Sequence, residues 1–140
     1  MRFLLLVVVL LVIPTESTIE SHHDDNDNMI ADTLLQGIVD SVKNNSNEEY
    51  GVYFTDSFDF ESWWRKFIAD LSDDQKENYK LVRFGDVEMK NDNYTIQFTE
   101  TYPLEETTHI QSYQATVIKI GNNKTSNGKF LINSWKIYES

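Results

Sequence analysis

Residues 58–72, FDFESWWRKFIADLS, decide the fold, because this stretch sets two of the chain's three tryptophans side by side. A helix with one broad apolar stripe is predicted, and such a stripe is wide enough for both indole rings. Asp59 or Ser57 is expected to cap its start. The stripe suits either a core or the wall of a dry pocket. It consists of Phe60, Trp63, Trp64, Phe67, Ile68 and Leu71.

A second helix is predicted before it, over residues 29–43, where apolar residues again recur at helical spacing. Asn28 is its expected N-cap, and the polar run 44–47 its expected end. Gly37 inside this helix costs up to about 1 kcal/mol relative to alanine. A brief strand is expected over residues 52–55.

After Lys76 the pattern changes to an alternation of apolar and polar residues, which indicates strands. A phase slip at Gly85-Asp86 predicts a bulge or a tight turn between the pair Val82 and Phe84 and the pair Val87 and Met89. The next strand has Tyr94, Ile96 and Phe98 on one face and is expected to end at Pro103. Two further strands are expected over residues 109–120 and 129–140, with turns at 91–93, 105–108 and 121–128.

The expected architecture is therefore α+β, a curved four-stranded antiparallel meander wrapped on N-terminal helices. The last two strands carry apolar residues in both phases, Val117 and Leu131 on one face and Ile118 and Ile132 on the other. A sheet that is apolar on both sides favours a homodimer through the sheet.

The first residues have the layout of a secretory signal peptide: a basic start at Arg2, an apolar run over residues 3–13 and a break at Pro14. A membrane anchor is the alternative, but a spanning helix needs about 20 apolar residues. We expect a signal peptide over residues 1–17, a flexible polar tail over 18–28 and one domain over 29–140. The protein is therefore expected to be secreted, with no membrane span.

Composition narrows the function further. The formal net charge of −11 disfavours nucleic acid and anionic membranes as partners. The absence of cysteine excludes thiol nucleophiles, redox pairs and thiolate metal sites. In a secreted chain the sequons at Asn44, Asn93 and Asn123 predict a glycoprotein.

The order of elements resembles the NTF2-like α+β cone, together with the strand SYQATVIKI and the ending FLINSWKIY, which contains Ile132, Trp135 and Ile137. The secreted, cysteine-free form is similar to the small secreted NTF2-like proteins of nematodes. A cystatin-like sheet is the nearest competitor, but the chain has no Q-x-V-x-G segment. The resemblance implies a cone-shaped cavity in a family that includes isomerase-like and dehydratase-like enzymes, transport factors and binding modules.

The isomerase-like pattern of that family pairs an early aspartate with a tyrosine, and Asp56 is near the right place. The partner position on the inner helix face is aliphatic, at Leu34 and Ile38. Asp56 is explained more simply as a turn former, and His109 as a solvent-facing strand residue. A lyase or isomerase using Asp56 and a tyrosine in an apolar pocket is therefore the alternative function.

A non-catalytic binding module is the function that we expect, with a small apolar ligand or a protein as its partner. We expect no catalytic residues, cofactor or metal, although the segment SHHDDND (21–27) offers metal-ligand types, including an amino-terminal copper site after cleavage. The candidate pocket residues are Trp63, Trp64, Phe67, Asp56, Phe98, Tyr113 and Trp135.

Overall fold

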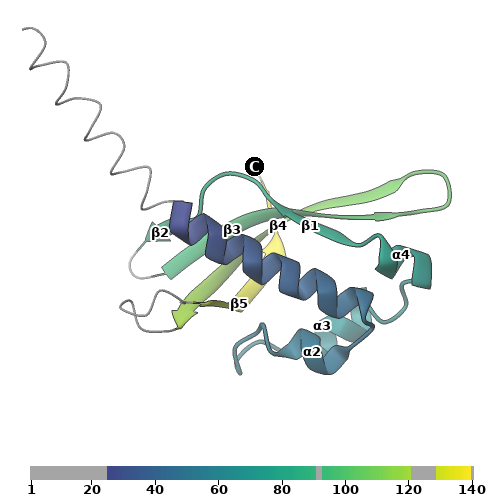
Figure 1. The fold of residues 1–140 in the computed structure, drawn as a ribbon, viewed down its shortest axis with the longest axis horizontal. Coiled ribbons are helices and arrows are strands. Elements are labelled where there is room, and N and C mark those ends of the chain that lie inside the picture. Colours follow the sequence, from purple (N-terminus) through teal and green to yellow (C-terminus); the bar gives the residue numbers. More distant parts are fainter. Residues whose placement is uncertain (1–24, 91–92, 121–128, 140) are drawn as a thin grey trace, which may run out of the picture.

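The computed structural model describes residues 25–90, 93–120 and 129–139, and it confirms the α+β class (Figure 1). The predicted signal peptide, residues 91–92 of the predicted turn 91–93 and the predicted turn 121–128 lie outside the described residues. The chain is helical over residues 25–43. The other helices are α2 (Asn47–Gly51), α3 (Phe60–Phe67) and α4 (Asp73–Glu77). The strands are β1 (Lys80–Arg83), β2 (Glu88–Lys90), β3 (Asn93–Pro103), β4 (Thr108–Ile120) and β5 (Lys129–Ile137).

The strands form one open antiparallel sheet in the order β1-β3-β4-β5, and β2 also pairs with β3. The first of the four predicted strands is divided into two short strands, β1 and β2, which pair with the same edge of β3. The sheet therefore has five strands rather than four. The chain breaks between them at Gly85, whose φ of 70° lies in the left-handed region that favours glycine. This break confirms the predicted phase slip, and β3 ends at Pro103 as predicted.

The faces of the strands agree with the alternation in β3 but not in β1. Ile96 and Phe98 of β3 point inward and are buried. In β1 it is Leu81 that is buried, whereas Val82 is 60% exposed, so the alternation of Val82 and Phe84 does not mark the buried face of this strand. The antiparallel register decides this, because Leu81 lies opposite the inward-facing Glu100 of β3.

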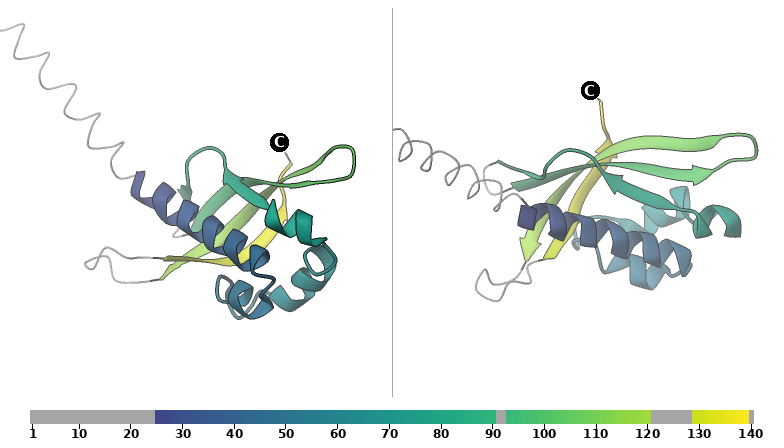
Figure 2. Two further views of the ribbon diagram at one scale, coloured as in Figure 1. Left: turned by 45° about the vertical axis from the view of Figure 1, so that its right-hand side comes forward. Right: turned by 45° about the horizontal axis from the view of Figure 1, so that its top comes forward.

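The helices lie together on one side of the sheet (Figures 1 and 2). The N-terminal helix crosses this face and buries Ala31, Leu34, Leu35, Ile38, Val39 and Val42. Asn28 is not its N-cap, since residues 25–28 are already helical. The last four residues of the predicted polar tail therefore belong to the helix.

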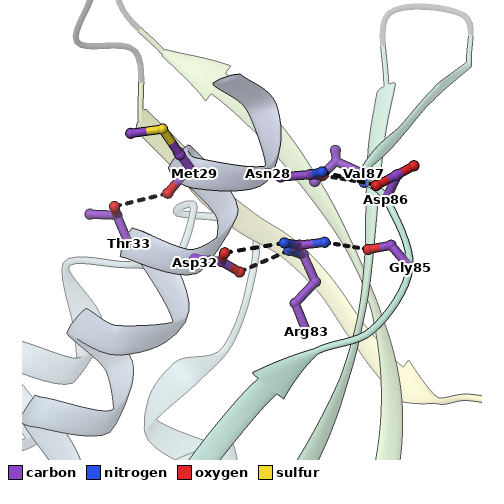
Figure 3. Close-up of polar contacts among 8 residues, drawn as sticks. All are labelled: Asn28, Met29, Asp32, Thr33, Arg83, Gly85, Asp86 and Val87. Atoms are coloured by element: carbon purple, nitrogen blue, oxygen red, sulfur yellow. Dashed lines mark hydrogen bonds and ion pairs between the residues drawn. The ribbon is translucent and has the colours of Figure 1, made fainter. Parts of the chain in front are cut away.

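Polar contacts fix the start of this helix to the break between β1 and β2 (Figure 3). Asn28 donates from Nδ2 to Asp86 at 2.9 Å and accepts from the backbone N–H of Val87 at 2.9 Å. Arg83 pairs with both carboxylate oxygens of Asp32, at 2.8 and 3.2 Å, and also donates to the carbonyl of Gly85. A bidentate pair fixes orientation as well as distance. These polar residues explain why the helix begins earlier than its apolar pattern.

No strand forms over residues 52–55, contrary to the prediction. A single parallel bridge joins Phe54 to Ile132 of β5. The segment follows α2, which begins directly after the predicted end of the long helix. Ser46 caps α2 by accepting from the N–H of Glu49 at 3.1 Å, and a reciprocal capping box at Ser72 and Gln75 starts α4.

The tryptophan helix α3 is confirmed, with Asp59 rather than Ser57 as its N-cap. It ends at Phe67, so Leu71 of the predicted stripe lies beyond the helix. Asp59 accepts from the N–H of Ser62 at 3.1 Å. Trp64 and Ile68 are buried and Trp63 is partly buried, but Phe67 is 46% exposed. The apolar stripe is therefore narrower than predicted, and Phe67 lies at its edge.

The apolar residues of the last two strands share faces in a different combination from the predicted one. Val117 pairs with Ile132 and both are buried, whereas Ile118 pairs with Leu131 on the opposite face. Dimerisation through the sheet stays a prediction.

Within the described parts of the chain, no helix is long and apolar enough to span a membrane.

Candidate functional site

The predicted pocket residues are mostly part of the aromatic core. Trp135 lies at its centre, 5.0 Å from the ring of Phe98, 5.1 Å from Trp63 and 5.5 Å from Tyr113. Trp64 is 6% exposed and packs against Tyr50 with ring centroids 5.0 Å apart. The adjacent tryptophans of α3 therefore contribute to the core, which has no disulfide to support it.

Asp56, the candidate base of the alternative function, does not join this cluster. It is exposed in the turn between α2 and α3. A general base works best in an apolar environment within reach of the proton that it removes. The surroundings of Asp56 favour the turn-former interpretation instead.

A buried polar cluster that the sequence analysis missed lies on the inner face of the sheet, around Glu100 of β3. The residue is only 5% exposed. Its carboxylate accepts from the hydroxyl of Tyr79 at 2.5 Å and faces Nε2 of His109 at 2.9 Å. The hydroxyl of Tyr113 stands 3.5 Å away. A buried carboxylate without partners would be very unfavourable, so these donors make the position tolerable.

His109 faces inward, contrary to the prediction that it faces solvent. Its register partner across the β3–β4 ladder is Tyr102, and the two rings stack at 4.2 Å with planes 11° apart. The His109 side chain keeps 28% of its surface exposed. It is thus the most accessible member of the cluster, and Tyr79, at 0% exposure, is the least accessible.

Tyr50 brings an unpaired hydroxyl to the same region. Its side chain is fully buried, and its hydroxyl has no hydrogen-bond partner among the described residues. Burial, then the charge of Glu100, raises the pKa of Tyr50, of Tyr79 and of Tyr113. The three tyrosines therefore stay protonated around the carboxylate.

The indole N–H groups of Trp63 and Trp135 are likewise buried without a described partner.

An apolar groove lies elsewhere, between the N-terminal helix and β5. This groove has a volume of about 430 Å³, a size within the usual range for small-molecule sites. Met29 and Val52 on its rim are 67% and 60% exposed, and Leu34 and Phe130 form a buried floor. The lining residues are Asn26, Met29, Ile30, Thr33, Leu34, Val52, Tyr53, Lys129, Phe130 and Leu131.

Gly37 allows one wall of the groove to form. A Cβ atom at this position would lie 2.5 Å from Cζ of Tyr53 and closer still to its hydroxyl oxygen. Real Cβ atoms do not approach other atoms so closely, so only glycine lets the Tyr53 ring lie against the helix. The packing of Tyr53 therefore explains why a glycine is present inside the helix despite its free-energy cost there.

None of the seven candidate pocket residues lines this groove. The described residues also contain no group of three or more histidine, aspartate or glutamate side chains that could hold a metal ion. His22, His23 and Asp24 lie outside the described part.

Comparisons of the chain with protein-family models, with curated proteins and with solved structures gave no match.

Proposed function

We propose that the protein is a secreted, non-catalytic binding module of the NTF2-like kind, and that the groove between the N-terminal helix and β5 binds a small apolar ligand. The groove carries this proposal. Its lining joins the exposed side chains of Met29 and Val52 to the buried Leu34 and Phe130, so a ligand lying there would remove a joined apolar surface from water. The arrangement of helices on one side of a single sheet (Figure 2) supports the resemblance to the NTF2-like cone.

A neutral fluorescent probe tests the proposal. N-phenyl-1-naphthylamine is expected to bind the wild-type protein with a rise in fluorescence, because the groove offers a dry apolar surface. The double variant Met29→Glu/Val52→Glu places two charges on the rim. It is expected to weaken binding about tenfold or more, since burying a charge beside an apolar ligand is unfavourable.

The matched control is Met89→Glu/Val82→Glu. These residues are of the same types and similarly exposed, at 64% and 60%, but they do not line the groove. The control is expected to bind the probe as the wild type does, with circular dichroism confirming that both variants are folded. Equal losses in both variants, or no binding by the wild type, would contradict the proposal.

Secretion and N-glycosylation belong to the same proposal. Asn44 and Asn93 are exposed, so two of the three sequons lie on the described surface. The full chain expressed in insect cells is expected in the medium, without residues 1–17 and smaller after glycosidase treatment. Retention of the unprocessed chain inside the cells would contradict this part.

A further inference from the structure

One stripe of the N-terminal helix forms a whole side of the groove. Five of its residues line the groove, and their spacing places them on a single face of the helix. They are Asn26, Met29, Ile30, Thr33 and Leu34. At a rise of about 1.5 Å per residue, this part of the stripe is about 12 Å long. A ligand that fills the groove would therefore lie along the helix.

Gly37 occupies the next turn of the same stripe, and the ring of Tyr53 covers it. Gly37 follows Thr33 by four residues and Leu34 by three, so it continues the face that lines the groove. A Cβ atom on Gly37 would lie 2.5 Å from Cζ and 2.6 Å from Cε1 of Tyr53, so the ring rests directly on the helix backbone. Tyr53 lines the groove and Gly37 does not. The ring therefore stands across the stripe at the point where the groove ends.

The main chain of Tyr53 holds the ring in this place. Its carbonyl accepts from the N–H of Ile132 in β5 at 2.9 Å, and its own N–H donates to the carbonyl of Tyr50 at 3.3 Å. The next residue, Phe54, is buried in the aromatic core. The ring is thus fixed between the helix and β5, where it can act as a wall.

The residues beside this wall are apolar or already paired. Leu34 is buried and Val52 presents an exposed apolar side chain. The hydroxyl of Thr33 donates to the carbonyl of Met29 at 2.9 Å, within the helix. The end of the groove at Tyr53 therefore suits the methyl end of a chain, which needs no hydrogen bond.

We propose that Tyr53, seated on Gly37, is the end wall of the groove and sets the longest apolar chain that the groove accepts. This inference rests on the proposed binding function and names the ligand as a linear chain of limited length. Each methylene group that is buried increases affinity about fourfold. A chain longer than the groove leaves its further methylene groups in water, so the gain stops at the length that reaches Tyr53.

Displacement of N-phenyl-1-naphthylamine by 1-alkanols, from 1-hexanol to 1-tetradecanol in steps of one methylene, tests the inference. In the wild type the affinity is expected to rise about fourfold per methylene and then to stop rising within the series. Tyr53→Ala removes the wall. The first alkanol beyond the wild-type limit is expected to bind this variant about fourfold more tightly than the alkanol at the limit.

Two control variants separate the ring of Tyr53 from other effects. Tyr53→Phe keeps the ring and is expected to keep the wild-type limit. Tyr138→Ala removes a tyrosine ring that packs against Phe84, with centroids 5.5 Å apart, and that does not line the groove, so it is also expected to keep the limit. Circular dichroism checks that each variant is folded. If Tyr53→Ala is not, Tyr53→Leu takes its place, since it removes the ring but keeps an apolar side chain.

The outcomes separate the two proposals. If the probe does not bind the wild type, the binding function fails. If the probe binds but the affinity rises through the whole series, or the limit is unchanged without the ring of Tyr53, the inference fails while the binding function stands. A limit that moves in Tyr53→Phe or in Tyr138→Ala would overturn the assignment to this ring.

Discussion

Replacing Trp135 with alanine is expected to lower the free energy of unfolding by about 3–5 kcal/mol. The residue is 5% exposed and its ring lies within 6.1 Å, centroid to centroid, of Phe54, Trp63, Phe98 and Tyr113. Its removal would leave a cavity bounded by the sheet, by α3 and by the segment around Phe54, and rings of this size cannot collapse to fill it.

Urea unfolding followed by far-ultraviolet circular dichroism measures this effect without relying on tryptophan fluorescence. The control is Phe67→Ala, which removes an aromatic ring that is 46% exposed and is expected to cost about 1 kcal/mol. Similar losses in the two variants would show that the ring of Trp135 is not at the centre of the core.

Replacing Tyr79 with phenylalanine is expected to destabilise the fold by about 1.5–3 kcal/mol. The substitution keeps the ring and removes the hydroxyl that donates to the buried carboxylate of Glu100 at 2.5 Å. A hydrogen bond to a charged group contributes more than a neutral one, and the carboxylate would lose a donor that no solvent can replace.

Tyr50→Phe is the matched control for this substitution. Both tyrosines are fully buried, but the Tyr50 hydroxyl has no partner among the described residues. Its removal is expected to change stability by about 0.5 kcal/mol or less, or to raise it. A loss in Tyr50→Phe as large as that in Tyr79→Phe would contradict the hydrogen-bond explanation.

The pH dependence of the same control provides a second readout. Because burial raises the pKa of Tyr50, the folded protein holds this proton at a pH where the unfolded chain has released it. Wild-type stability should therefore fall as the pH rises above about 10, the ordinary tyrosine value. Tyr50→Phe has no hydroxyl to titrate at this position, so its stability relative to the wild type should increase above that pH.

The helices and the long strands could be predicted because their patterns are local. The inward alternation of β3 and the N-cap at Asp59 both agree with the structure. The short helices α2 and α4 were missed although each follows a serine with Glu49 or Gln75 three residues later, which is the sequence signature of a capped helix start. Their lack of an apolar stripe hid them.

The buried cluster was missed for a different reason. Glu100 has the same strand parity as Ile96 and Phe98, so the alternation already placed it inward. An acidic residue in a strand is ordinarily taken as exposed, and only the positions of Tyr79 and His109, which come from elsewhere in the chain, make its burial tolerable. The groove depends even more on tertiary packing, because a helix, a turn and a strand each supply part of it. The one local sign of it was Gly37.

The bridge between Phe54 and Ile132 has a consequence for self-association. The backbone of Ile132 exchanges hydrogen bonds with residues 53 and 55, at 2.9 Å each, so this part of the β5 border cannot accept a strand from another molecule. The opposite border is interrupted at Gly85 and carries the exposed charges of Lys80, Glu88 and Lys90. Charged and broken borders discourage one chain from extending another's sheet, which protects the protein from fibre-like growth at high concentration.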